Sequence, residues 1–295
     1  MISYAQNRED VVLARVFERT SGFYVDVGAA SPTVHSVTRW FYETGWKGIN
    51  IDPGPRWHRE LMAERPRDAN LPIGLHDEPG VLQLLVGGDE ISGQSTFSES
   101  VGASLRAVGN VLTPMEVPVR TLASVLDEYA PSEIDFLKID VEGWERQVIS
   151  GGDWKRHRPK VVVVEATTPN TSTPSHAEWA DALVDHGYLE CLFDGLNRFY
   201  VRCENGELLD ALSTPANALD DYELGDVVAL QDEVRRLAQE ARKQSREREL
   251  LAQDLDALRT EYLATLHRAD DSTMQLRVAR EALETAIGMN DESMP

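Results

Sequence analysis

The sequence has little of what a secreted or membrane protein needs. It contains two cysteines, Cys191 and Cys203, whose spacing fits neither a CxxC pair nor a zinc site. No apolar run approaches the ~18 residues of a membrane-spanning helix. The N-terminus, MISYAQNRED, lacks the apolar stretch of a signal peptide. We therefore expect a cytoplasmic protein with free thiols and no membrane partner.

Basic residues are also scarce. The 295-residue chain has 29 Lys and Arg against 50 Asp and Glu, which gives a formal net charge of -21. Such a surface repels the phosphate backbone of nucleic acids, and no stretch gathers Lys and Arg into a basic patch. The composition therefore disfavours nucleic acid as a partner, while 42% hydrophobic residues suit a globular protein with a core.

Proline and glycine are absent from residues 227–286, where the composition changes. All six tryptophans and every proline except Pro295 come before residue 223. Good helix formers fill the stretch instead, and its apolar residues recur alternately three and four positions apart. This heptad register predicts a coiled-coil helix over residues 223–295. The register comprises Val227, Leu230, Val234, Leu237, Ala241, Leu251, Leu255, Leu258, Tyr262, Ala269, Leu276, Ala279, Leu283 and Ala286, with polar Gln244, Arg248, Thr265 and Ser272.

Self-association through residues 227–286 is the simplest use of such a helix, so a homo-oligomer is expected. Docking on another coiled-coil protein is one alternative. A single solvated helix held by charge pairs is another. The four polar residues weaken the seam but also help to specify register and partner number.

Residues 1–222 alternate between strand-like and helix-like segments. Strands are predicted at 23–29, 48–52, 71–75, 134–140 and 160–166, with a local strand at 80–86 and a closing hairpin of 188–193 and 198–202. Helices are predicted at 7–20 with Asn7 as N-cap, at 37–44, 55–65, 121–129 and 145–150, and from a Ser175–Glu178 capping box to His186. The polar residues 90–109 are interpreted as a loop. The alternation predicts an α/β fold with a Rossmann-like seven-stranded sheet in the order 3-2-1-4-5-7-6.

The first predicted strand ends in an acid and a glycine turn, Asp26-Val27-Gly28. Glycine lets the backbone approach a ligand closely. The later glycines of the dinucleotide fingerprint are replaced by Ala30 and Thr33, and no P-loop lysine follows. The turn therefore suits a cationic ligand, such as the amino group of S-adenosylmethionine, better than a pyrophosphate. A strand-end acid that only caps its turn is the alternative.

Two more acids follow predicted strands. Asp52 ends the second strand, at roughly the spacing from Gly28 at which an acid binds a ribose hydroxyl pair. Asp77, just after residues 71–75, is placed to meet an adenine amino group, although a plain turn residue is the alternative. Together with Asp26 they describe a ligand that joins a nucleoside to an amino acid.

The fourth strand ends in Lys138, Asp140 and Glu142, which alternation places on one side of an extended chain. A carboxylate there could accept the proton of a hydroxyl group that attacks a methyl group, while Lys138 keeps the acids ionised. A salt-bridge set that seats the turn is the alternative. Glu165, at the end of the fifth strand, is a neighbouring candidate. Asp140, Glu142 and Glu165 also offer oxygen ligands for a divalent cation, although no metal site is predicted.

Three blocks of sequence carry a family resemblance. They are YAQNREDVVL near the start, FYVDVGAASPTVHSVTRWFYETGWKGINIDP, and EIDFLKIDVEGWE. Over about residues 3–205 the chain resembles the FkbM family of methyltransferases. The resemblance implies the methyltransferase form of the sheet, S-adenosyl-L-methionine as cofactor, and methyl transfer to an oxygen, often of a sugar or polyketide. The coiled-coil segment is not part of the family pattern.

The resemblance also implies roles for single positions. Those that match the family's motifs are Gln6, Glu9 and Asp10 beside the cofactor, Asp26 and Gly28 in the glycine turn, Asp52 at the end of strand 2, and Asp140 and Glu142 in the strand 4 motif. Two positions depart from the pattern. Asp52 replaces a usual Glu, so a shorter side chain must reach the ribose. Ser31 stands in a turn where many members have Asn, so its hydroxyl or a backbone amide is left to contact the methionine carboxylate.

The sequence thus predicts an FkbM-like methyltransferase domain over residues 1–222 and a coiled-coil domain over 223–295. The expected activity is S-adenosylmethionine-dependent O-methylation of a small-molecule or glycan hydroxyl. One alternative is a non-catalytic assembly protein with a methyltransferase-like head. Another is an NAD-dependent oxidoreductase, which the missing glycines and the closing antiparallel hairpin disfavour.

Overall fold

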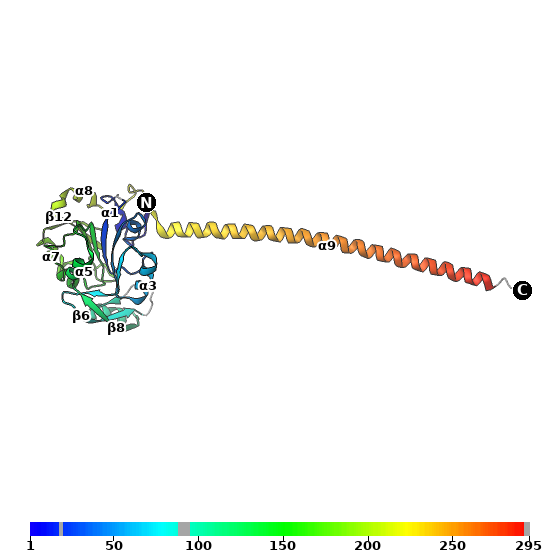
Figure 1. Cartoon of the computed structure of the whole chain (residues 1–295), viewed down its shortest axis with the longest axis horizontal. Coiled ribbons are helices and arrows are strands. Elements are labelled where there is room, and N and C mark those ends of the chain that lie inside the picture. The colour runs from blue at the N-terminus through cyan, green and yellow to red at the C-terminus, as the bar shows by residue number, and fades with distance from the viewer. Residues whose placement is uncertain (18–19, 88–94, 292–295) are drawn as a thin grey trace. The chain divides into compact units, whose positions relative to one another are not determined.

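The structure is a computed structural model that describes residues 1–17, 20–87 and 95–291. The chain divides into two units, Met1–Val227 and Val228–Pro295. The first unit is an α/β domain, and residues 228–291 of the second belong to one long helix (Figure 1).

The centre of the first unit is a mixed seven-stranded sheet in the order β4-β3-β2-β9-β10-β12-β11. Numbered along the chain among themselves, these strands lie in the order 3-2-1-4-5-7-6. All neighbours are parallel except β10–β12 and β12–β11. The strands are β2 (Phe23–Val27), β3 (Lys47–Ile51), β4 (Ala69–Leu71), β9 (Phe136–Ile139), β10 (Val161–Glu165), β11 (Tyr188–Phe193) and β12 (Asn197–Arg202).

Helices cover both faces of this sheet, so its inner strands read as apolar runs. The β-branched run Val161–Val164 is wholly buried in β10. One face packs against α5 (Leu122–Tyr129), α6 (Glu145–Ser150) and α7 (Ala180–Val184), and the other against α1 (Glu9–Ala14), α2 (Arg39–Glu43) and α8 (Leu209–Leu212). The second face holds an aromatic cluster in which the rings of Phe41 and Phe136 lie 4.9 Å apart.

A second, four-stranded sheet in the order β5-β8-β6-β7 lies beyond β4 in the chain. Its strands are β5 (Gly74–Leu75), β6 (Gly80–Gly87), β7 (Ser95–Thr96) and β8 (Leu112–Arg120), with α4 (Glu99–Ala107) between the last two. Strands β6 and β8 form a long antiparallel pair, visible at the lower edge of the unit in Figure 1. The remaining elements are α3 (Pro55–Glu64), the short pair β1 (Ile2–Ser3) and β13 (Glu223–Leu224), and the 3-10 turns His176–Glu178 and Cys203–Leu208.

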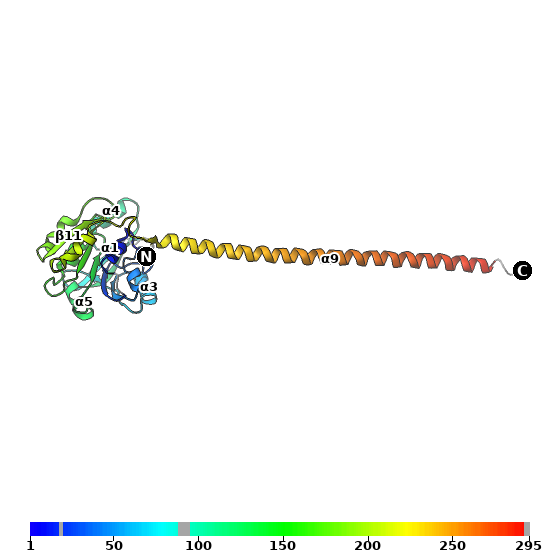
Figure 2. The ribbon, with the colours of Figure 1, turned by 90° about the horizontal axis from the view of Figure 1, so that it is seen from above.

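The long helix α9 (Gly225–Asp291) spans 67 residues without a break (Figures 1 and 2). Its apolar heptad residues as far as Leu283 are exposed; Leu237 is 50% exposed and Leu255 is 68% exposed. Within the described residues, no helix is long and apolar enough to cross a membrane.

Several predicted elements differ from the observed ones. The predicted helix 7–20 is only α1, because Arg8 adopts a left-handed conformation at its start and replaces Asn7 as the N-cap. The predicted strand 71–75 is two short strands in different sheets, β4 and β5. The Ser175–Glu178 capping box is not formed, since the Ser175 side chain makes no cap hydrogen bond.

The predicted loop 90–109 is also wrong in part. Residues 88–94 lie outside the described residues, but the rest forms β7 and α4, whose N-cap Ser98 accepts a hydrogen bond from Val101. The long strand β8 was not predicted. In contrast, Thr121 caps α5 as predicted, and both cysteines are free.

Candidate active site

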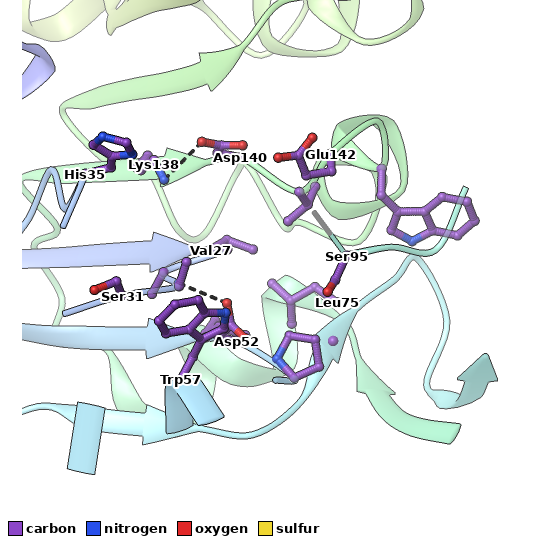
Figure 3. Close-up of a pocket in the computed structure, with 18 of the residues that line it drawn as sticks. Val27, Ser31, His35, Asp52, Trp57, Leu75, Ser95, Lys138, Asp140 and Glu142 are labelled. Carbon is purple, nitrogen blue, oxygen red and sulfur yellow. Dashed lines mark hydrogen bonds and ion pairs between the residues drawn. The ribbon is translucent and has the colours of Figure 1, made fainter. Parts of the chain in front are cut away.

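A cavity of about 330 Å³ lies at the carboxyl ends of β2, β3 and β9 (Figure 3). This is the edge of a parallel sheet at which ligands of doubly wound folds bind. Seven of the eleven predicted site residues line the cavity: Gln6, Gly28, Ser31, Asp52, Lys138, Asp140 and Glu142.

Gly28 is the point of closest backbone approach in the cavity wall. A Cβ atom there would lie 1.7 Å from the carbonyl oxygen of Asp140, and the φ angle of Gly28 is +78°. Strands β2 and β9 are direct neighbours, so the turn after β2 presses against the end of β9. Both the close contact and the left-handed conformation therefore require glycine.

Asp52 is buried at the end of β3, with an exposed fraction of 8%. Its carboxylate accepts hydrogen bonds from the backbone amides of Ala30, at 2.9 Å, and Gly54, at 2.7 Å. These bonds hold the turn after β2 and leave further lone pairs on both oxygens. Burial raises the pKa of Asp52 to about 6. The ring of Trp57 lies beside the carboxylate (Figure 3).

Lys138 is the buried cation of the site. Its Nζ lies 3.3 Å from the Asp140 carboxylate and 3.6 Å from the Asp26 carboxylate. Burial alone lowers the pKa of Lys138, but the charges of Asp140 and Asp26 outweigh that effect, so the pKa is raised above its ordinary value. Lys138 therefore stays charged and compensates the carboxylates of Asp140 and Asp26.

Glu142 lies in a tight turn after β9, where it has a φ of 54° and Gly143 has a φ of 88°. The Glu145 carboxylate accepts hydrogen bonds from the amides of Val141 and Gly143, and the Thr96 hydroxyl donates to the Glu142 carbonyl at 2.7 Å. Figure 3 shows the Glu142 carboxylate beside that of Asp140. Burial and the Asp140 charge raise the pKa of Glu142, which makes it a stronger base than an ordinary glutamate.

A comparison with models of protein families shows to which family this chain belongs. The model of the methyltransferase FkbM domain matches residues 26–190, which is more than half of the chain. The chain belongs to the FkbM methyltransferase family. The resemblance drawn from the sequence blocks is thereby confirmed, and the matched range includes every cavity-lining residue predicted above except Gln6.

Two solved structures are similar to this chain. The methyltransferase FkbM of Methylobacillus flagellatus KT has 15% sequence identity and a TM-score of 0.36, over 64% of this chain and 47% of that chain. The chain thus spans about half the length of that protein. A TehB-like SAM-dependent methyltransferase of Corynebacterium glutamicum has 8% identity and a TM-score of 0.37, over 66% and 87% of the two chains. No curated protein matches the chain.

Four predicted cofactor-binding residues do not line the cavity of the FkbM domain. Asp10 accepts hydrogen bonds from the Ser3 hydroxyl and the Tyr4 amide, both at 2.7 Å. Glu9 accepts from the Asn7 amide and, at 2.7 Å, from the Asn197 side chain. These two acids fold the N-terminal segment that brings Gln6 to the cavity, so they act on the site through the backbone.

The other two are Asp26 and Asp77. Asp26 is 1% exposed; it accepts a hydrogen bond from the Thr38 hydroxyl and pairs with Lys138. Asp77 lies 2.6 Å from the ring of His76, and its side chain is 47% exposed. The predicted adenine contact of Asp77 assumed one continuous strand before it, whereas β5 belongs to the second sheet.

Part of the cavity wall was missed in the sequence. Leu84, Ser95 and Phe97 come from the second sheet and the segment after β7. Phe97 lies 5.9 Å from the ring of Trp144. No motif marks these residues, since their place depends on the pairing of β6 with β8.

Ser31 has a local role in addition to its place in the wall. Its hydroxyl accepts hydrogen bonds from the amides of Thr33 and Val34, at 3.3 and 3.1 Å. The hydroxyl thus shapes the turn after β2. Among the described residues, no group of three or more His, Cys, Asp or Glu side chains is arranged to hold a metal ion.

Proposed function

We propose that this protein is an S-adenosylmethionine-dependent O-methyltransferase whose acceptor is a hydroxyl group of a sugar or glycan. The observation that carries the proposal is the cavity in which Gly28, Asp52 and the pair Asp140 and Glu142 meet at adjacent strand ends. Family membership supports the reaction class. The oxygen acceptor and its sugar class rest on the family resemblance.

The residues present fit the cofactor on one observation. The buried Asp52 retains free lone pairs at the end of β3, where a ribose hydroxyl pair can donate to them. Gln6, Ser31 and the backbone of the turn after β2 would hold the methionine part.

The bound cofactor supplies an electrophilic methyl group on a sulfonium. The chain's own residues orient the acceptor and remove its proton. Glu142 is the proposed proton acceptor, because its raised pKa is closer to that of the hydroxyl than an ordinary carboxylate's is. Lys138 holds the Asp140 carboxylate in place. Most of the rate enhancement comes from positioning the two reactants.

The acceptor class is tested by mass spectrometry of glycans from cells with and without the protein. The proposal predicts that a glycan species gains the mass of one methylene group, because a methyl group replaces the hydroxyl proton, and only when the protein is present. A Glu142→Gln protein should not restore that species in cells that lack the protein, because the amide cannot take the proton. Identical glycan masses in all three samples contradict a glycan acceptor.

We also propose that α9 forms a coiled coil that joins copies of this chain in the cytoplasm. The apolar residues of one heptad register are exposed along α9, which a partner helix would cover. The two free cysteines support a reducing compartment.

Removal of residues 228–295 should lower the number of subunits per particle, because the seam is lost while the first unit stays whole. Light scattering of the full chain and the shortened protein measures this number. A control with Leu237 and Leu255 changed to Asp keeps the length of the chain but breaks the seam, so it should dissociate likewise. An unchanged subunit count in both proteins contradicts the proposal.

A further inference from the structure

Glu165 lies at the carboxyl end of β10, beside the site but outside the cavity wall. The strand register places Val164 opposite Ile139, so Glu165 lies next to Asp140, and on its other side it pairs with Asn197 of β12. Glu165 is only 7% exposed. Its Oε2 has no hydrogen-bond partner among the described residues.

The charged groups that face Glu165 are nearly all acidic. Asp140 comes from the end of β9 and is its hydrogen-bonding partner, Glu142 comes from the following turn, and Glu145 comes from the start of α6. The buried cation nearby, Lys138, already pairs with Asp140 and Asp26.

The polar and charged side chains next to Glu165 on β12 and α1 are already paired with other groups. The Asn197 side-chain amide donates to Glu9 and Asp194. Arg198 pairs with Glu190. No further cation is therefore engaged with Glu165 among these described neighbours.

A buried carboxyl group among other carboxylates favours its neutral form. Burial and then the charges of Asp140, Glu142 and Glu145 raise the pKa of Glu165. Two carboxyl groups in contact do not both ionise readily, and such a pair holds one proton between them. A protonated Glu165 supplies an O–H donor to Asp140, which a carboxylate cannot do.

We propose that Glu165 is a positioning residue that rests as a neutral carboxylic acid and shares its proton with Asp140. The part that this shared proton plays in methyl transfer rests on the proposed function. The hydrogen bond fixes the Asp140 carboxylate against Lys138 and leaves Glu142 to take the hydroxyl proton. As the acceptor oxygen bonds to the methyl carbon and the carbon–sulfur bond breaks, that proton moves to Glu142, so the shared proton is not consumed.

Urea unfolding of the full chain tests the shared proton directly. Tryptophan fluorescence reports on the first unit, because all six tryptophans precede residue 223. In the unfolded chain Glu165 loses its proton above pH ~4.3, whereas the folded protein keeps it. Unfolding then releases a proton, and the unfolding constant rises by up to about tenfold per pH unit as pH increases.

The Glu165→Gln protein lacks this proton, so the ratio of wild-type to variant unfolding constants should rise with pH from about 5 to about 7. The matched control is Glu116→Gln, at an exposed position on β8, whose ratio to wild type should not change with pH. A pH-independent ratio for Glu165→Gln overturns the proposal.

Titration with S-adenosylmethionine separates this proposal from the proposed function. Asp140 lines the cavity proposed for the cofactor, so its position affects cofactor binding. Glutamine can still donate to Asp140, so Glu165→Gln should keep the wild-type affinity within about threefold, whereas Glu165→Leu should lose about tenfold or more. Equal losses in the two variants overturn the positioning role. If not even the wild type binds the cofactor, the proposed function fails, while the unfolding ratios still decide whether Glu165 holds the proton.

Discussion

Gly28→Ala should reduce the free energy of unfolding by about 3 kcal/mol and weaken S-adenosylmethionine binding by about 100-fold or more. The added Cβ would lie 1.7 Å from the Asp140 carbonyl oxygen, and Gly28 has a φ of +78°. Backbone atoms on both sides of the contact cannot rotate away as a side chain does. The ends of β2 and β9 must therefore separate. This separation displaces both the turn after β2 and the Asp140 side chain, which form part of the cavity wall.

Gly80→Ala is the matched control for this change. Gly80 begins β6, and an added Cβ there would have no atom within 4 Å. We expect a change in the free energy of unfolding below about 1 kcal/mol and unchanged cofactor affinity. Urea unfolding and calorimetric titration measure the two quantities. If Gly28→Ala behaved like Gly80→Ala, the close contact between the two strand ends would not exist in solution.

Lys138→Met should destabilise the first unit by about 3–5 kcal/mol at neutral pH, because it leaves the carboxylates of Asp26 and Asp140 without their counter-charge. The pKa of Lys138 is raised in the folded protein. Its stabilising contribution is therefore fully present below ~10.4, the pKa of the unfolded side chain, and is lost as pH rises through the folded value.

The control for Lys138→Met is Lys47→Met, at the exposed first residue of β3. A lysine on the surface of a strand contributes little, so we expect a change within about 0.5 kcal/mol. Urea unfolding at neutral pH measures both variants. A loss below about 1 kcal/mol for Lys138→Met would mean that the charges of Lys138, Asp26 and Asp140 do not stabilise one another in the folded protein.

Much of the central sheet could be predicted from the sequence, because its strands are buried on both faces. The run Val161–Val164 and the acid and glycine that end β2 are local signals, and both lie where the pattern indicates. The rule that ligands bind at the carboxyl ends of parallel strands then places Gly28, Asp52 and Asp140 in one cavity without knowledge of side-chain contacts.

Of the second sheet, β6 matches the strand predicted at 80–86, whereas its partner β8 could not be predicted, for an equally local reason. Strand β8 contains Pro114 and Pro118, which argue against a paired strand. They are accommodated because β5 pairs only with Val119 and Arg120, so the edge beside the prolines is open. The helix after Ser98 was likewise hidden by the polar composition of its segment.

The electrostatics of the site depend on pairing between strands that are distant in sequence. The contacts of Lys138 with Asp26, and of Glu165 with Asp140, exist because β9 lies between β2 and β10. The sequence at the end of one strand shows that an acidic residue is present, but it does not show which charged residue of a neighbouring strand faces that acid. The sequence therefore predicts a cofactor contact for Asp26 but does not show that Asp26 also pairs with Lys138.

Calorimetric titration of S-adenosylmethionine into the full-length protein at neutral pH tests the central claim most directly. The account predicts one binding site per chain, whose affinity falls by about tenfold or more in Asp52→Ala because a buried acceptor for the ribose is lost. Absence of binding to the wild type, or equal binding to the wild type and Asp52→Ala, would contradict it.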